Sequence, residues 1–180
     1  MLSLTLSVDY HSLVGIIRVH FAEGFITRVE LKTKSIKEPS STPDGLPMSI
    51  KRYLDSYFLK KPTPIKPQWF KAPQSTFAKK IYRTLQTVKF GTQISYGDLA
   101  KKAGYSAHYA RAVGQAMHKN PWPLFVPCHR VISGNGDIGG FSADESIKKA
   151  LLSHEGFQVS TALPFNVERL PLDRKVLDVS

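Results

Sequence analysis

The order of apolar and polar residues in the first 60 positions predicts strands followed by one helix. Residues 2–7 alternate leucine with serine or threonine, which is typical of a half-buried strand. Two further β-rich runs, 13–17 and 25–31, are separated by a Glu-Gly pair at 23–24, which indicates a turn and therefore a hairpin or meander. Across 49–58 the apolar residues recur at helical spacing. Nothing in these 60 positions suggests catalysis.

Proline-rich sequence separates this region from the next apolar pattern. Residues 34–47 are rich in Ser, Pro and Lys and predict an exposed connection. Further prolines at positions 62, 64, 67 and 73 fix the backbone φ angle and stiffen the chain. We therefore expect a small N-terminal α/β domain over 1–70, ending in this linker, and a mainly helical C-terminal domain over 71–180. The predicted fold class is α/β (α+β).

Helix start and stop signals recur after the linker. A first helix can be capped by Ser75 or Thr76 and carries apolar residues on one face. Ser95 is a second N-cap, opening a short helix that Gly104 closes, and Ser106 can cap a third helix that runs to about Lys119. Helix, glycine-containing turn and helix together predict a helix-turn-helix over 95–119.

The third helix of this series is unusually poor in large side chains. Ala110, Ala112, Gly114 and Ala116 leave part of its surface nearly bare. Glycine inside a helix costs up to about 1 kcal/mol relative to alanine, so small residues here need a reason. Close helix packing and close approach to a ligand both require small side chains, and the sequence leaves the two open.

The segment before residue 128 is apolar and stiffened by three prolines, and it presents the only cysteine of the chain, Cys128, next to His129. A single cysteine excludes a disulfide within the chain and a zinc site of several thiolates. A rigidly held thiol beside an imidazole can be a nucleophile. The alternative is that Cys128 is a small core residue, since free cysteine is among the most buried residue types.

Charge is distributed unevenly along the 180 residues, whose formal net charge is +11. Residues 51–130 hold 15 Lys and Arg against Asp55 and Asp98, whereas the remaining 100 residues are close to neutral. A segment of this kind favours a polyanionic partner, usually nucleic acid, although a merely soluble basic face is the alternative. No apolar run approaches 18 residues and the N-terminus lacks a signal-peptide pattern, so we expect a soluble protein of the cytoplasm or nucleus with no membrane partner.

Five motifs, in order, resemble the O6-alkylguanine-DNA alkyltransferase family, and they span roughly residues 75–157. They are Ser95-Tyr-Gly-Asp-Leu-Ala100, Arg111-Ala-Val-Gly-Gln-Ala-Met117, Pro127-Cys-His-Arg-Val131, Phe141-Ser142 and His154-Glu-Gly156. The resemblance implies DNA repair in one irreversible turnover, with an alkyl group moved from O6-alkylguanine, and also from O4-alkylthymine, to a cysteine. No metal or organic cofactor is implied.

The same resemblance assigns roles in the reaction to four residues. Cys128 is the alkyl acceptor, His129 takes the thiol proton through a water, Glu155 holds the imidazole, and Tyr96 gives a proton toward the guanine ring. Aromatic packing is the alternative for Tyr96. Glu155 stands before Gly156 at a predicted helix C-terminus, where a carboxylate is electrostatically unfavourable, and this is a mild functional indication.

Roles in binding DNA follow from the resemblance in the same way. Arg111 is the finger that enters the base stack, where the alternative is one more phosphate contact; Ala112 and Gly114 lie in the helix that enters the minor groove. Asn120 is a hinge, and the Val131 carbonyl reads the exocyclic amine of the base. Two further residues belong to the loop over the base: Ser142, which contacts O6, and Phe141, which replaces a tyrosine and so loses its hydroxyl.

The expected partner is therefore double-stranded DNA containing O6-alkylguanine, bound through its minor groove by a monomer. A helix-turn-helix protein that binds alkylated DNA without repairing it is the alternative, and it has no use for the thiol of Cys128. A cysteine hydrolase is disfavoured by the basic segment and by the lack of an oxyanion-hole motif.

Overall fold

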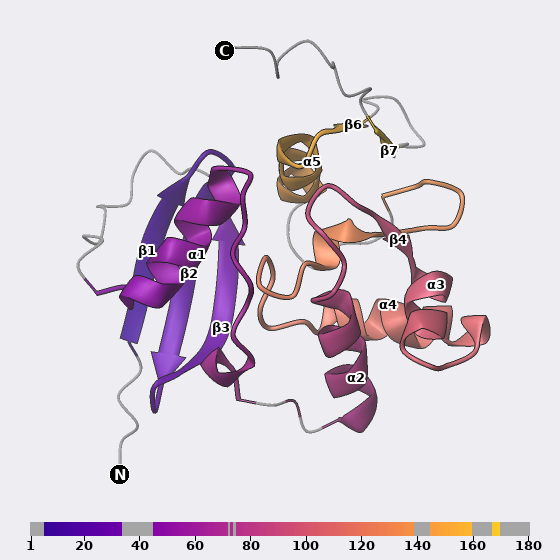
Figure 1. Cartoon of the computed structure of the whole chain (residues 1–180), viewed down its shortest axis with the longest axis horizontal. Helices are drawn as coiled ribbons and strands as arrows, with labels where there is room; N and C mark the ends of the chain where they lie inside the picture. Colours follow the sequence, from indigo (N-terminus) through magenta and orange to yellow (C-terminus); the bar gives the residue numbers. More distant parts are fainter. Residues whose placement is uncertain are drawn as a thin grey trace, which may run out of the picture.

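The computed structural model describes residues 6–33, 45–71, 73, 75–138, 145–159 and 167–169. The N-terminal unit is an antiparallel sheet of β1 (Leu6–Ser12), β2 (Gly15–Ala22) and β3 (Phe25–Lys32), in the order β1-β2-β3. Helix α1 (Met48–Phe58) lies across one face of this sheet (Figure 1). The predicted meander, with its turn at 23–24, and the predicted helix over 49–58 are confirmed.

The strand boundaries differ from those predicted. The described part of β1 begins at Leu6, so most of the predicted strand over 2–7 lies outside the described residues. The prediction that strand begins at Leu13 is wrong, because Leu13 and Val14 form the turn between β1 and β2. Gly15 follows this turn with φ +128, a conformation that other residues rarely adopt.

The C-terminal unit contains the predicted helix-turn-helix. Its elements are α2 (Thr76–Leu85), β4 (Ile94–Ser95), α3 (Tyr96–Lys102), η2 (Ala107–Tyr109), α4 (Ala110–His118), η3 (Cys128–Arg130), β5 (Val131–Ile132), α5 (Glu145–His154), β6 (Phe157–Val159) and β7 (Val167–Arg169). The side chain of Ser75 caps α2, and that of Ser95 caps α3 by accepting from the Asp98 N–H at 3.0 Å. Ser106 caps the 3₁₀ turn η2, so α4 begins about three residues later than predicted.

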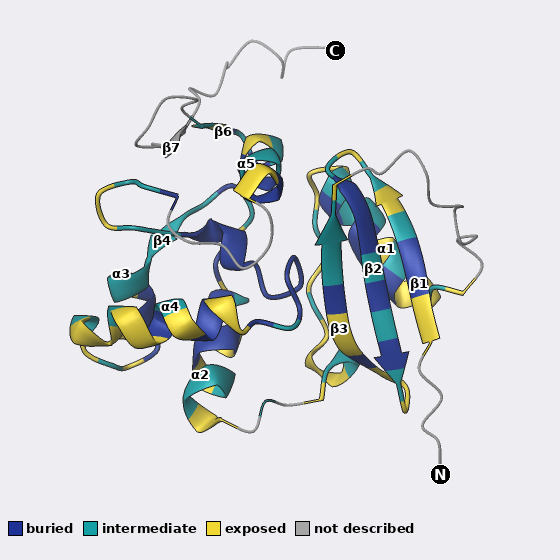
Figure 2. Cartoon of the chain, turned by 180° about the vertical axis from the view of Figure 1, so that it is seen from behind, coloured by how far each residue is buried: buried dark blue, intermediate teal, exposed yellow. Residues whose placement is uncertain are grey.

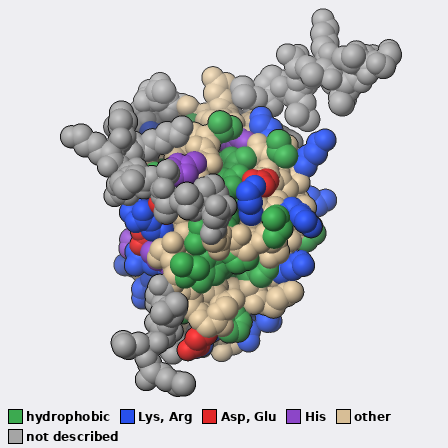
Figure 3. Space-filling model, turned by 90° about the vertical axis from the view of Figure 1, so that its left-hand side faces the viewer, with side chains coloured by type: hydrophobic (Ala, Val, Ile, Leu, Met, Phe, Trp, Pro, Cys, Tyr) green, Lys and Arg blue, Asp and Glu red, His purple; other side chains and the backbone are tan. Residues whose placement is uncertain are grey.

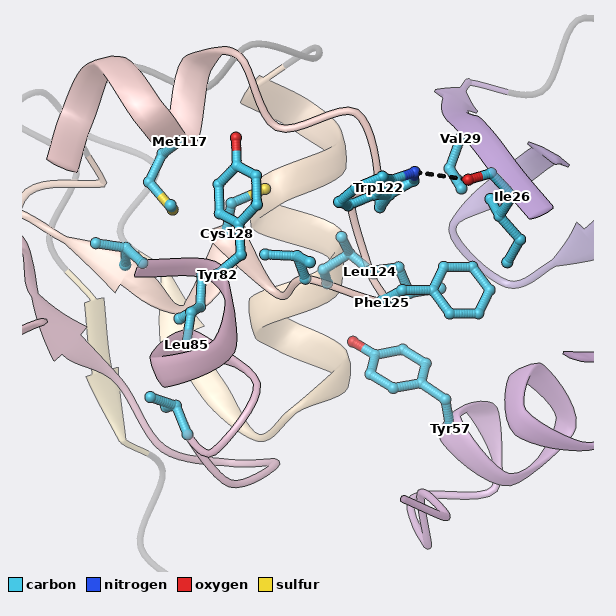
Figure 4. Packing of buried hydrophobic residues seen from close by; sticks show 14 of the residues in the cluster. Ile26, Val29, Tyr57, Tyr82, Leu85, Met117, Trp122, Leu124, Phe125 and Cys128 are labelled. Atoms are coloured by element: carbon cyan, nitrogen blue, oxygen red, sulfur yellow. Dashed lines mark hydrogen bonds between the residues drawn. The ribbon is translucent and has the colours of Figure 1, made fainter. Parts of the chain in front are cut away.

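One hydrophobic cluster runs through both units. The Trp122 indole donates to the Ile26 carbonyl at 3.0 Å (Figure 4). The Val29 N–H donates to the Pro121 carbonyl at 2.8 Å. The ring of Tyr53 stacks on Phe125 with centroids 4.9 Å apart. Buried residues gather on β2 and on the segment between α4 and β5 (Figure 2), and β3 adds Ile26 and Val29. The boundary at residue 70 stays a prediction, since both units contribute to this core.

The outer face of the N-terminal unit is not uniformly basic. Figure 3 shows hydrophobic side chains gathered at the middle of this face, with Lys and Arg side chains toward its margins. No helix within the described ranges has the length and apolar content needed to cross a membrane.

Candidate active site and DNA-contacting helix

Cys128 is the first residue of the short 3₁₀ helix η3, and backbone hydrogen bonds hold the chain before and after this helix. The Cys128 N–H donates to the Val126 carbonyl at 2.7 Å, and the chain after η3 forms β5. β5 pairs in parallel with β4, Ile94 opposite Val131, and β4 leads directly into Tyr96. This pairing brings the start of the helix-turn-helix beside the cysteine segment.

Cys128 is 2% exposed and belongs to the buried cluster drawn in Figure 4, near enough to Tyr82 for the thiol to influence the pKa of that phenol. Burial raises the pKa of the Cys128 thiol, although a hydrogen bond with Asn120 and the charge of Lys148 act in the opposite direction. The resting side chain is therefore a thiol, and a nucleophilic role requires a base that takes its proton during the reaction.

His129 is the candidate for such a base. Its Nε2 lies 2.8 Å from Glu155 Oε1, and both side chains are fully buried. A carboxylate only accepts, so Nε2 carries the proton and Nδ1 is the acceptor. Nδ1 has no hydrogen-bond partner within the described part of the chain. Burial lowers the pKa of His129 and Glu155 opposes this, so the resting imidazole is neutral and can accept a proton.

Glu155 is surrounded by donors. Oε2 accepts from the Gly91 N–H at 3.0 Å, and the Arg130 guanidinium donates from Nε and Nη2 at 2.9–3.1 Å. Burial alone would raise the pKa of this carboxyl group, but the charges and hydrogen bonds of His129 and Arg130 hold it at about 2. Glu155 is thus an anion with hydrogen-bond donors on both oxygens. Its position after the last residue of α5 would not by itself stabilise a negative charge.

A further donor to Glu155 comes from the N-terminal unit. The Tyr57 hydroxyl, on α1, donates to Glu155 Oε1 at 2.9 Å. Sequence analysis predicted no residue of 1–60 near the candidate site, and the structure adds one: Tyr57 of α1 joins the polar network of His129 and Glu155. The signal in the sequence was a tyrosine on the apolar face of a helix, which reads equally well as a core residue.

Lys148 was not predicted, and it is fully buried near the thiol. Its Nζ donates to the carbonyls of Val131, at 2.8 Å, and Ile138. Burial lowers its pKa to about 8, although the Cys128 charge opposes this. A sequence signal existed: Lys148 stands four residues before Leu152, on the apolar stripe of α5. Because Lys148 donates to the Val131 carbonyl, one lone pair of that oxygen is already used. A contact with the amine of a base would have to use the other.

Tyr96 stands at the first position of α3, and its ring faces Gly114 of α4. A Cβ at Gly114 would lie 3.9 Å from this ring, in ordinary contact. The pKa of Tyr96 is raised by burial and then by Cys128, so its hydroxyl keeps its proton and lies near enough to the thiol to sense its charge. The ring therefore packs between helices and also borders the candidate nucleophile.

The small residues of α4 serve two different surfaces. Ala116 is buried, and its carbonyl accepts from the Tyr82 hydroxyl at 2.8 Å, as close helix packing requires. Ala112 is exposed, and together with Arg111 and Gln115 it lines a shallow groove on the outer face of α4. Helix packing therefore explains Ala116, whereas the approach of a ligand to Ala112 stays a prediction.

Asn120 ties α4 to the cysteine segment. Its side-chain amide donates to the Val126 carbonyl at 2.9 Å, and its oxygen accepts from the Trp122 N–H at 3.0 Å. Phe141 and Ser142 lie outside the described residues. Within the ranges that are described, no three His, Cys, Asp or Glu side chains gather in a group able to hold a metal ion.

Comparison with known proteins finds that residues 76–157 match the family model described as 6-O-methylguanine DNA methyltransferase, DNA binding domain. The methylated-DNA–protein-cysteine methyltransferase of Cricetulus griseus is 47% identical over 85 residues, which are 46% of this chain and 40% of that protein. The alignments thus cover only about 40% of the length of the first curated relatives.

Solved structures resemble the chain over most of its length. The crystal structure of the Mycobacterium tuberculosis O6-methylguanine methyltransferase matches with a TM-score of 0.67 and 25% identity, covering 84% of this chain and 93% of that one. The Mycobacterium tuberculosis OGT in complex with DNA matches with a TM-score of 0.66 and 26% identity, over 83% and 92% of the two chains. The predicted mixed α/β fold class is confirmed by these likenesses.

Proposed function

Because residues 76–157 match the family model of the 6-O-methylguanine DNA methyltransferase DNA-binding domain, we propose that this chain repairs DNA by moving an alkyl group from O6 of guanine to Cys128. The observation that carries the proposal is the buried pair of His129 and Glu155 beside the only thiol of the chain. A neutral imidazole whose Nδ1 has no hydrogen-bond partner among the described residues can accept the proton that the thiol must lose.

The reaction needs one proton to leave the thiol and one to reach the base. His129 Nδ1 takes the thiol proton through a water, and Glu155 stabilises the imidazolium that forms. The sulfur attacks the alkyl carbon, the S–C bond forms as the C–O6 bond breaks, and the electron pair stays with the guanine. Tyr96 supplies a proton to the guanine ring and is reprotonated later. The thioether is a poor leaving group, so each molecule acts once.

Recognition of DNA is assigned to the outer face of α4. Arg111 and Ala112 line its groove, and the basic segment 51–130 supplies phosphate contacts. The attacked carbon is hidden inside a duplex, so the nucleotide must leave the stack, and Arg111 takes its place. We propose minor-groove binding by a single copy of the chain, with O4-alkylthymine as a second substrate.

A duplex with one O6-methylguanine carrying a labelled methyl group tests this function. The expected result is stoichiometric transfer of the label to the peptide that contains Cys128, identified by mass, with one equivalent per protein molecule. Label that stays on the DNA after prolonged incubation with folded protein would contradict the proposal.

A second candidate function is binding of alkylated DNA without repair. The raised pKa of the buried Cys128 thiol favours it, because the resting sulfur is not ionised. The same duplex separates the two functions: a binder retards the duplex in a mobility shift and leaves the label on the DNA.

A further inference from the structure

One oxygen of Glu155 is shared between the two units of the chain. Oε1 accepts from His129 Nε2 at 2.8 Å and from the Tyr57 hydroxyl at 2.9 Å. The Tyr57 oxygen lies 3.4 Å from His129 Nε2, so phenol and imidazole approach the carboxylate side by side. A change in the hydrogen bond from Tyr57 to Glu155 therefore changes the negative charge that Glu155 presents to the His129 imidazole.

The Tyr57 ring is held firmly in this position. It packs edge-on against Phe58 and Phe90, with ring centroids 5.1 and 5.5 Å away. The His154 Nε2 donates to the Tyr57 carbonyl at 3.1 Å, which anchors the backbone of α1 to the end of α5. Tyr57 is fully buried, so no water competes for its hydroxyl at the surface.

The Tyr57 hydroxyl is the donor in its hydrogen bond with Glu155, because a carboxylate only accepts. Burial raises its pKa well above the ordinary value, and the charge of Glu155 raises it further. The phenol therefore stays neutral throughout the working pH range and donates one hydrogen bond to Glu155.

We propose that Tyr57 is a positioning residue of the proton relay: by donating to Glu155 Oε1 it sets how strongly the carboxylate attracts the proton on His129. Helix α1 thereby takes part in a reaction whose reacting groups all belong to the C-terminal unit. This inference rests on the function proposed above and deepens it.

The direction of the effect follows from the sharing of Oε1. Without the phenol, more of the negative charge of Glu155 faces His129, so the pKa of the imidazole rises and it becomes protonated at a higher pH. The other titratable or charged groups near this pair and Tyr57 come from three elements: Tyr53 of α1, Cys128 and Arg130 of η3, and Lys148 and His154 of α5. None of these is altered by removing one hydroxyl from Tyr57.

Two tyrosines of α1 provide a matched test. Tyr57→Phe removes the bond to Glu155, whereas Tyr53→Phe removes a buried hydroxyl one turn earlier, which donates to the Leu124 carbonyl at 3.3 Å. The rate of benzyl transfer from free O6-benzylguanine is measured from pH 5 to 9 for both. We expect the acid limb of Tyr57→Phe to move up by about half to one pH unit, and that of Tyr53→Phe to stay in place.

Replacement of Tyr57 by 3-fluorotyrosine provides a second variant that keeps the ring and the hydroxyl. Fluorine makes the phenol a stronger donor, so the acid limb should move to lower pH, the opposite of Tyr57→Phe. Acid limbs of both position-57 variants that coincide with the wild type, whatever their melting temperatures, would overturn the inference and leave Tyr57 as a packing residue.

The titration of the His129 imidazole, followed by NMR in the same proteins, separates this inference from the proposed function. It requires no alkyl transfer. If the wild type transfers no benzyl group while the imidazole pKa rises in Tyr57→Phe, the function fails but the coupling holds. If transfer proceeds and the imidazole pKa is unchanged in both position-57 variants, the coupling fails alone.

Discussion

The residues around Cys128 form two regions that differ in how complete they are. The relay region, made of Tyr57, His129, Arg130 and Glu155, is buried, and within the described residues its side-chain polar atoms other than His129 Nδ1 are hydrogen-bonded. The recognition face, the outer side of α4 with Arg111, is exposed and hollowed only by a shallow groove. Folding alone assembles the first region, whereas the function proposed above requires DNA to complete the second.

A physical reason underlies this difference. A charge taken out of water must find its partners inside the protein, because an unpaired buried ion costs several kcal/mol. The relay region therefore has to be built together with the core. An exposed arginine is already solvated and can exchange its water for a ligand later. The comparison predicts that changes in the relay region affect both stability and chemistry, while changes on the recognition face affect duplex DNA alone.

The largest expected effect is that of Cys128→Ser, which tests whether the two regions act independently. We expect complete loss of alkyl transfer and nearly unchanged affinity for the methylated duplex, because binding rests on α4 and on phosphate contacts. Transfer is measured with the labelled duplex and affinity by a mobility shift. Methyl transfer to the serine variant would show that the nucleophile lies elsewhere.

Glu155→Gln should have the next largest effect. It leaves the Arg130 charge buried without its carboxylate, and breaking such a pair costs about 3–5 kcal/mol of unfolding free energy. Transfer should also slow, and the residual rate should rise toward pH 9, because without the relay the thiol loses its proton only at higher pH. Urea unfolding and the transfer rate measure the two effects.

The control is Glu145→Gln on the same helix, whose half-exposed carboxylate pairs with Lys149 at 3.0 Å and contributes at most about 1 kcal/mol.

The folded-state pKa of Glu155 is about 2, below its ordinary value of 4.5, so the unfolded chain binds more protons between these values. The extra stability of the wild type over Glu155→Gln should thus be complete above pH 4.5 and shrink as the pH falls toward 2. A constant difference over this range would mean that Glu155 is not an anion in the folded protein.

Arg111→Ala tests the recognition face. The rate of repair of the duplex should fall by about 10- to 100-fold, because stacking of the Arg111 side chain would no longer offset the free energy of moving the base out of the stack. The reaction with free O6-benzylguanine should stay unchanged, since a free base needs no extrusion. Arg83→Ala, an exposed position on α2, is the control and should cost no more than one phosphate contact. Equal losses of Arg111→Ala on both substrates would contradict the role of a finger.

Much of the fold could be predicted because local signals and tertiary packing agree. The caps at Ser75 and Ser95 and the turn at 23–24 are short-range features, and each lies where the sequence places it. The start of α4 was placed too early, because a cap at Ser106 does not distinguish a 3₁₀ turn from an α-helix. The turn at 13–14 was read as strand, since leucine and valine there resemble strand residues.

The candidate site was only partly predictable for a different reason. Cys128 and His129 are adjacent in sequence, so a motif can contain both. Tyr57 meets Glu155 across 98 positions, and the phenol on the apolar face of α1 has the same pattern as a core residue. Lys148 was hidden in the same way within the apolar stripe of α5. Long-range polar contacts of buried residues leave no periodic signal in a sequence.

The smallest expected effect concerns the protein after it has reacted, and it tests how closely the relay region is packed. Cys128 is 2% exposed, and alkylation adds volume beside Tyr82 and removes the hydrogen bond between the thiol and Asn120. Adding a methylene to a packed interior costs about 1–3 kcal/mol, and each kcal/mol lowers the melting temperature of a protein of this size by about 2–4 °C.

The methylated protein should therefore melt several degrees below the unreacted one, and the benzylated protein lower still. Cys128→Ser treated in the same way is the control, because it carries no group that accepts the alkyl and its melting temperature should not move. Coincident melting curves for unreacted, methylated and benzylated protein would show that the alkyl group occupies space left for the base. The two regions would then no longer differ in this respect, because the surroundings of Cys128 would be as open as the outer face of α4.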